Sequence, residues 1–403
     1  MTKELEVGGL SRRQFGAAAA AALAGGLVPA TAQAATFVPN ETLISSAIDL
    51  IDMEYSSERK QYARVDNSAQ LWVGDIDPDT GDYVDPTGRQ YLVDTNTMNT
   101  GDLFWVYTGA EWMQTADGRE AVVYTKFVPG KRHQANNARI GYAEPNADGT
   151  WTAGVLPPGD RARFDIYGIE ELGADKRPAL FYLDAQKNKV WRNFDDPTER
   201  IIPGTTTNGA HAIRFVRGAR AVVYRSKVND VWQVFRYDLD TLAVQQLTFE
   251  NDEKSLCWMW AAPDFGGDFV LMVLAKTREI RFYRNLPDAQ GNLKWTQFYK
   301  VSGARGSTIQ SLEPFTWNGR SYFFMDLELP NFDFPSEIWF GNLDLANPIW
   351  RCVSPATPVN VRTDPEFFIT NNGPIIYYLQ FVPGAPKQDG AIGMFRCNPL
   401  LTA

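Results

Sequence analysis

The chain has 403 residues, a net charge of −9 and an aromatic content of 13%. Nucleic acids and anionic membranes bind proteins through basic surfaces, so this acidic balance excludes both as expected partners. Aromatic residues favour strands, and their abundance predicts a protein rich in β-structure.

The N-terminus has the pattern of an export signal. Arg12 and Arg13 precede a weakly apolar run over residues 16–30, and an Ala-x-Ala cleavage site ends at Ala34. The paired arginines indicate the twin-arginine route, with an ordinary Sec signal or a membrane anchor as the alternative. We predict a signal peptide over residues 1–34, cleavage after Ala34, and a periplasmic or extracellular protein.

Helical spacing of apolar residues occurs once after the signal, over residues 41–57. We predict a short N-terminal helix there. No later run approaches the roughly 20 apolar residues that a membrane-spanning helix needs, so we expect no membrane span.

The remaining chain reads as short strands joined by turns. Residues 70–93 form a candidate outer hairpin, because a strand is followed by Asp, Pro and Gly turn residues. Similar outer strands occur at residues 70–77, 234–240, 337–344 and 393–399.

Apolar inner strands recur at regular intervals. They end near Tyr124, Tyr182, Tyr224, Met272, Phe324 and Tyr377. The 253 residues from the first to the last make five steps of about 51 residues, close to the period of β-propellers. We predict an all-β fold in which residues 35–403 form a single β-propeller of six or seven four-stranded blades.

The blade number depends on the hairpin at residues 70–93. It either completes the last blade, which would close the ring and hide an open sheet edge, or belongs to a seventh blade. Residues 109–124 ("GAEWMQTADGREAVVY") and 209–224 ("GAHAIRFVRGARAVVY") share one frame, yet Glu111 in the first stands where His211 stands in the second. Because inner strands of a propeller start at one channel mouth, we interpret this position as facing a shared site.

Candidate catalytic residues follow from that position. They are Glu111, His211, Asp264, Glu313, Asp364 and Glu366. Glycoside cleavage needs one protonated and one ionised carboxyl group, and crowding of carboxylates raises the pKa of some of them. The alternative is that such residues only bind loop amides, and that the histidine is a satisfied core residue.

Candidate substrate-binding residues lie beside these positions. They are Trp112, Arg163, Asp165, Trp260 and Arg362. Aromatic faces suit sugar rings, and arginine binds a uronate carboxylate with two hydrogen bonds. The alternative for the arginines is that they neutralise carboxylates of the channel.

We expect no cofactor and no metal centre. Two histidines in the whole chain exclude a multi-histidine metal site, and the acidic turns at 75–82 and 331–337 suggest at most a structural calcium, since neither fits the EF-hand spacing. Of the three cysteines, Cys352 and Cys397 are the best candidates for a disulfide in an exported protein, and three buried thiols are the alternative.

The inner-strand carboxylates on a propeller resemble those of the family 43 glycoside hydrolases, which hold an Asp base, a Glu acid and a pKa-tuning Asp at the channel mouth. The resemblance implies a carbohydrate substrate and a secreted glycoside hydrolase. It makes Glu111, Glu313 and Glu366 candidate acids, and Asp165, Asp264 and Asp364 candidate bases or tuning residues. We expect a monomer.

Two other functions stay open. The chain also resembles propeller polysaccharide lyases, which cleave uronate glycosides by β-elimination, and His211, Tyr167 and Arg163 would then carry the site. The third hypothesis is a non-catalytic periplasmic propeller of the TolB type that binds a glycan or a protein, since propellers host many functions.

Overall fold

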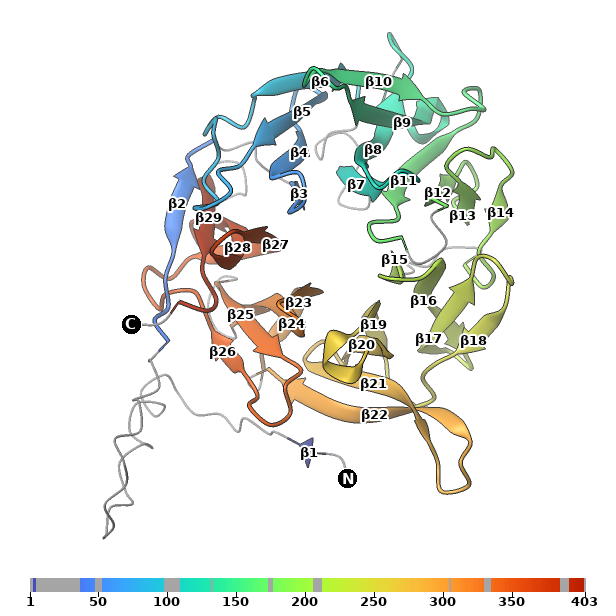
Figure 1. The fold of residues 1–403 in the computed structure, drawn as a ribbon, viewed down its shortest axis with the longest axis vertical. Coiled ribbons are helices and arrows are strands. Elements are labelled where there is room, and N and C mark those ends of the chain that lie inside the picture. Colours follow the sequence, from blue (N-terminus) through green and yellow to red (C-terminus); the bar gives the residue numbers. More distant parts are fainter. Residues whose placement is uncertain are drawn as a thin grey trace.

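The computed structural model describes residues 3–4, 37–47, 53–97, 109–131, 133–172, 177–205, 212–303, 306–329, 335–384 and 391–401. Seven sheets stand as blades around a central channel (Figure 1). The prediction of an all-β propeller is confirmed, and the number of blades is seven. The helical elements of the described residues are two single turns, η2 (Ala135–Asn137) and η3 (Pro263–Phe265).

Each of the first six blades is built from four consecutive antiparallel strands, and the first of them lies innermost (Figure 1). From the inner to the outer edge, the first three blades are β3 (Glu54–Ser56), β4 (Gln61–Val65), β5 (Gln70–Asp75) and β6 (Tyr91–Thr95); β7 (Ala110–Gln114), β8 (Glu120–Phe127), β9 (Ala138–Pro145) and β10 (Trp151–Val155); and β11 (Arg163–Gly168), β12 (Ala179–Asp184), β13 (Lys189–Asn193) and β14 (Arg200–Ile201). The next three are β15 (Ile213–Phe215), β16 (Ala221–Val228), β17 (Val231–Asp238) and β18 (Val244–Gln246); β19 (Lys254–Ala261), β20 (Phe269–Ala275), β21 (Glu279–Pro287) and β22 (Leu293–Ser302); and β23 (Thr308–Trp317), β24 (Arg320–Glu328), β25 (Ser336–Asn342) and β26 (Trp350–Cys352).

The seventh blade joins the two ends of the chain. Its inner strands are β27 (Val361–Thr370), β28 (Gly373–Phe381) and β29 (Ala391–Cys397), and β2 (Thr42–Ser45) forms its outer edge (Figure 1). A further short strand, β1 (Lys3–Glu4), pairs in parallel with β22.

The structure decides between the two alternatives for the hairpin at residues 70–93. It belongs to a seventh blade, because it forms the outer half of a sheet with its own inner pair and does not close the ring. Another expectation about the N-terminal part needs correction. The helix predicted over residues 41–57 is wrong where the structure describes it, since β2 and β3 are strands; residues 48–52 lie outside the described residues. Pairing with neighbouring strands overrides a weak local helix preference there.

The ring closure contains a buried ion pair. The Glu41 carboxylate accepts a hydrogen bond from Arg362 Nε at 3.2 Å, from the Tyr378 hydroxyl at 3.0 Å and from Gln380 Nε2 at 2.7 Å. The Arg362 side chain is 2% exposed. Glu41, the residue before β2, therefore contacts β27 and β28, the two innermost strands of the last blade. These contacts fix the register of the closing strand.

The hydrophobic core lies between neighbouring blades. Every residue of β28 is buried, and Phe315 of the sixth blade stacks on Phe367 of the seventh with ring centroids 5.1 Å apart. Within blades, a large ring on the second strand covers a glycine on the third. A Cβ on Gly141 would lie 2.4 Å from the Tyr124 ring, so only glycine fits there.

The cysteines form no disulfide. Cys257, Cys352 and Cys397 are free thiols, and the predicted pairing of the last two is wrong in this structure. The Cys352 Sγ instead donates to the Ser354 carbonyl at 3.4 Å. Within the described residues, no helix is both long and apolar enough to cross a membrane. Residues 5–36, with most of the predicted signal peptide, lie outside the described residues.

The closure leads to a stability prediction. Replacing Arg362 by Met leaves the Glu41 carboxylate without its counter-charge, and breaking a buried pair in this way typically costs about 3–5 kcal/mol. We expect Arg362→Met to lower the free energy of unfolding by about 3 kcal/mol in urea titrations followed by tryptophan fluorescence.

Arg320→Met is the matched control, because the Arg320 side chain is 53% exposed in its ion pair with Asp344. Such an exposed pair contributes little to stability, because solvent screens it. Equal losses for the two variants would contradict a special role of the closure.

Candidate functional site

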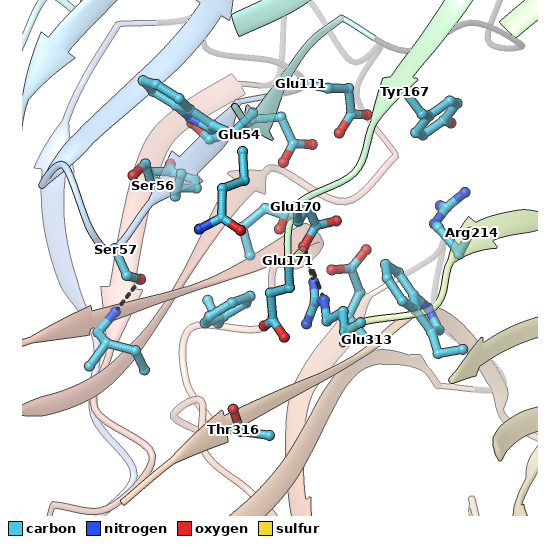
Figure 2. A pocket seen from close by; sticks show the side chains of 18 of the residues that line it. Glu54, Ser56, Ser57, Glu111, Tyr167, Glu170, Glu171, Arg214, Glu313 and Thr316 are labelled. Atoms are coloured by element: carbon cyan, nitrogen blue, oxygen red, sulfur yellow. Dashed lines mark hydrogen bonds and ion pairs between the residues drawn. The ribbon is translucent and has the colours of Figure 1, made fainter. Parts of the chain in front are cut away.

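A cavity of about 560 Å³ lies on the channel axis, and all seven blades contribute to its wall. Nine of its lining residues are carboxylates and two are arginines, so it is strongly acidic. Figure 2 shows Glu54, Glu111, Glu170, Glu171 and Glu313 directed toward one space from different blades.

Five of the eleven predicted site residues line this cavity. They are Glu111, Trp112, Glu313, Asp364 and Glu366. Glu313 and Glu366 occupy the same place on neighbouring blades, since Glu313 pairs with Phe324 and Glu366 with Tyr377 on their second strands.

A β-bulge sets this place in three blades. The bulge residues adopt left-handed backbone angles, with φ of 58° at Asp165, 43° at Ser311 and 55° at Asp364. Regular pairing resumes two residues later, at Tyr167, Glu313 and Glu366. A bulge redirects the side chains that follow it, and here those side chains line the cavity.

In the structure, the residue of the fourth blade that corresponds to Glu111 is Arg214 and not His211. Glu111 pairs with Val123, and the residue that pairs with the corresponding Val223 is Arg214. Arg214 precedes its paired valine by nine residues, whereas Glu111 precedes its own by twelve, so the equivalent position lies further along the chain than residue 211. His211 lies outside the described residues.

The carboxyl groups of Glu313 and Glu366 are unusual acids. Burial raises the pKa of Glu313 to about 7, against the favourable charges of Arg214 and Arg217. Burial also raises the pKa of Glu366 well above its usual value, and the neighbouring charges of Glu313 and Asp364 raise it further. The pair therefore keeps a proton to higher pH than ordinary glutamates do.

The two arginines occupy one side of the cavity. Arg217 forms an ion pair with Glu170 at 2.7 Å, and its guanidinium lies 5.1 Å from the centre of the Trp258 ring. The Arg214 guanidinium lies 5.0 Å from the same ring and 5.3 Å from that of Tyr167. Burial opposes the charge of Arg214, but Tyr167, Glu313 and Glu111 outweigh it and raise its pKa, so this cation is permanent.

On the opposite side, carboxylates predominate. Glu54, Glu111 and Glu120 come from the first two blades. The Ser56 hydroxyl donates to Glu120, whose pKa burial nevertheless raises. Trp112 contributes little ring surface, because it is 5% exposed and its Nε1 donates to the Glu54 carbonyl.

The remaining described candidates lie away from the cavity and have structural partners. Arg163 forms a two-fold hydrogen bond with Glu199 in the third blade. Asp165 is buried and pairs with Lys189 at 2.5 Å. Arg362 belongs to the ring closure described above.

The two candidates of the fifth blade share one partner, Ser321 of the sixth blade. Trp260 Nε1 donates to the Ser321 hydroxyl at 3.0 Å, and the Asp264 carboxylate accepts from the Ser321 amide at 2.7 Å. The aromatic side chain that reaches the cavity from this blade is Trp258, two residues earlier.

Several lining residues escaped the sequence analysis, among them Glu54, Glu120, Glu170, Arg214 and Arg217. Glu170 and Arg217 follow the inner strands rather than starting them, and Glu120 belongs to a second strand. A signal was present for Arg214, because aligning the Ala-Val-Val-Tyr segments of the second strands places it opposite the same valine as Glu111.

No group of three or more His, Cys, Asp or Glu side chains in the described ranges is arranged to hold a metal ion. In the first acidic turn considered for calcium, the Asp77 carboxylate accepts hydrogen bonds from the amides of Asp79 and Thr80. This is ordinary turn chemistry. In the second, residues 331–334 lie outside the described residues.

No protein-family model and no curated protein matches this chain. TolB from Acinetobacter baumannii aligns at 12% identity and a TM-score of 0.39, over 70% of this chain and 64% of that chain. A prolyl endopeptidase aligns at 14% identity and a TM-score of 0.45, over 86% of this chain and 47% of that chain. A chain of a nidogen/laminin complex aligns at 11% identity and a TM-score of 0.38, over 73% of this chain and 93% of that chain.

The chain thus spans less than two thirds of the TolB chain and about half of the peptidase. Likenesses of this strength carry no argument about activity. The seven blades differ from the five of the family 43 glycoside hydrolases, and that resemblance stays a prediction.

Asp326, a buried residue beside the cavity wall, leads to a prediction about how stability depends on pH. Asp326 on β24 is 3% exposed, and its Oδ1 has no hydrogen-bond partner among the described residues. Burial raises its pKa from 3.8 to about 7, against a hydrogen bond from Ser311. Below pH 4 the carboxyl is protonated in both folded and unfolded chains, so its contribution to stability is fully present. Between about pH 4 and 7 only the unfolded chain releases the proton, and stability is lost.

Asp326→Asn removes this loss. We expect the stability of the variant relative to the wild type to increase from pH 4 to pH 7, by about 1.4 kcal/mol for each unit of raised pKa, and then to level off. Urea unfolding at a series of pH values measures it. A difference that does not change with pH would show that Asp326 is ionised in the folded protein.

Proposed function

We propose that the protein is a glycoside hydrolase whose active site is the axial cavity. The observation that carries the proposal is the pair Glu313 and Glu366, two carboxyl groups whose pKa values burial and their neighbours raise inside one cavity. Raised carboxyl pKa values in a cleft are typical of general acids.

The chemistry needs a proton donor on one side of the glycosidic bond and a carboxylate on the other. The pair Glu313 and Glu366 titrates as a unit, and its protonated member donates to the glycosidic oxygen as the bond to the anomeric carbon breaks. The leaving sugar departs as an alcohol. A water molecule adds to the anomeric carbon and gives up a proton to the second carboxylate, so atoms and charge balance.

Glu111 is the best candidate for that second carboxylate. It lies on the second blade, across the ring from the sixth blade that carries Glu313, and Figure 2 shows it directed toward the space that Glu313 also faces. Only the first blade separates it from the seventh blade. A donor at Glu313 and an acceptor at Glu111 suit attack on one face of a sugar and departure from the other.

Aromatic side chains supply the flat surfaces that sugar rings require. Tyr167, Trp258 and Phe367 line the cavity from three blades. All three have a guanidinium near their rings, which fixes the rings in position. We also propose, from the sequence signal, that the enzyme acts outside the cytoplasm.

The lyase hypothesis loses Arg163, which forms an ion pair away from the cavity. Arg362, a candidate for binding a uronate, is likewise engaged in an ion pair elsewhere, and an acidic wall repels uronate carboxylates. A binding protein without catalysis remains the outcome if glycans bind the cavity but are never cleaved.

The acid pair leads to a mutational prediction. Glu366→Gln keeps the shape of the side chain but removes its proton chemistry, and we expect kcat to fall by about 10²–10⁴-fold with an unchanged circular dichroism spectrum. The assay is the release of reducing ends from a panel of neutral, amino and uronate glycans.

Asp148→Asn is the control. This carboxylate is exposed in the turn between β9 and β10, at the outer edge of the second blade, and it does not line the cavity. We expect its kcat to match the wild type. A folded Glu366→Gln protein with full activity would exclude the acid role.

The raised pKa of Glu313 also predicts a pH profile. Loss of the acid proton above about pH 7 should lower kcat/KM by about tenfold for each further pH unit. The measurement is kcat/KM from pH 4 to 9. In Glu313→Gln the alkaline limb should move to a different pH, and an unmoved limb would assign it to another group.

A further inference from the structure

We propose that the substrate of this cavity is a glycan with free amino groups, a polymer of protonated amino sugars. The inference rests on the proposed hydrolase function, since it names the substrate of the same site. It is carried by the charge and asymmetry of the cavity wall.

The wall carries more negative charge than its own cations offset. Carboxylates number nine among the lining residues and arginines two. Two nearby cations offset part of it. The charge of Arg59 acts on Glu120, and Lys60 Nζ donates to the carbonyl of Ile369, which also lines the cavity. Protonation of Glu313 and Glu366 reduces the excess without removing it.

The two arginines do not neutralise the cavity evenly. Both come from the fourth blade. They contact Tyr167 and Glu170 of the third blade and Trp258 of the fifth. The described lining residues of the first, second and seventh blades include no arginine or lysine, but they include Glu54, Glu111, Glu120, Asp364 and Glu366. Among the described lining residues, the two arginines therefore lie on one side of the cavity and acidic side chains predominate on the other.

Unmet acceptors face this space. Glu313 and Glu366 accept no hydrogen bond from the described residues, and Figure 2 shows Glu313 directed into the cavity. An ammonium group has three N–H donors and no acceptor, so it can bridge several carboxylates at once. Hydrogen bonds between charged partners are the stronger kind.

Other sugars fit this wall less well. A uronate adds like charge to a cavity that already has an excess of it. A neutral or N-acetylated sugar leaves the repulsion between the carboxylates in place. A sugar amine relieves that repulsion, while its ring can lie against Trp258 or Tyr167.

Binding is measured separately from cleavage, by calorimetry on the full chain carrying Glu366→Gln. The probes are tetramers of glucosamine, of N-acetylglucosamine and of galacturonate, together with tetralysine, at low salt and about pH 6. We expect the glucosamine tetramer to bind at least about tenfold more tightly than its acetylated counterpart, and galacturonate not to bind.

Equal or tighter binding of the acetylated tetramer would overturn the inference. So would tetralysine binding as tightly as the amino sugar, because the cavity would then recognise a cation without its sugar. Tight binding of the amino sugar that wild-type protein never cleaves would support the inference and refute the hydrolase. Cleavage of acetylated or neutral glycans without amine preference would do the reverse.

Variants locate the amine. In the Glu366→Gln background, Glu54→Gln and Glu111→Gln should each weaken binding of the glucosamine tetramer by about tenfold and weaken binding of the acetylated tetramer less. Asp148→Asn removes the same charge from an exposed turn and should change neither. Equal weakening by all three variants would show that only net charge matters, which would contradict a defined amine subsite.

Discussion

Burial of like charges at the axis is the constraint on which the rest of the structure depends. Carboxylates from several blades meet in one cavity, where low polarity and mutual repulsion oppose their ionisation. The blades hold them there because each blade packs its apolar faces against two neighbours. The stability of the ring offsets the electrostatic strain at its centre, and that strain produces the raised pKa values of Glu313 and Glu366.

The arginines modify this balance on one side only. Arg217 is paired with Glu170 and lies over Trp258, so its position is determined by both charge and ring contact. The result is a cavity with one neutralised wall and one acidic wall. A site of this kind can orient a polar ligand by charge before any group reacts with it.

The sequence was informative where periodicity controls structure. The recurring apolar strands predicted the propeller, and the residues that precede the turn glycines identified Glu111, Glu313 and Glu366 as cavity residues. Local irregularities limited the rest. A bulge after Phe164 brings Tyr167 rather than Asp165 to the cavity, and a different pairing register in the fourth blade brings Arg214. A shift of one residue turns a strand side chain to the opposite face, so such details cannot be inferred from spacing alone.

The strand that closes the ring has a consequence for the order of folding. β2 precedes the first blade, whereas its partner β29 is the last strand of the ring in the sequence. The earliest residues of the propeller therefore cannot reach their final pairing until the last blade has been synthesised. Until then the seventh-blade position stays an open edge on both sides, and contacts of such long sequence separation form slowly. Completion of this fold is a late event, and once the two ends are paired, opening the ring requires separating strands that no single local fluctuation releases.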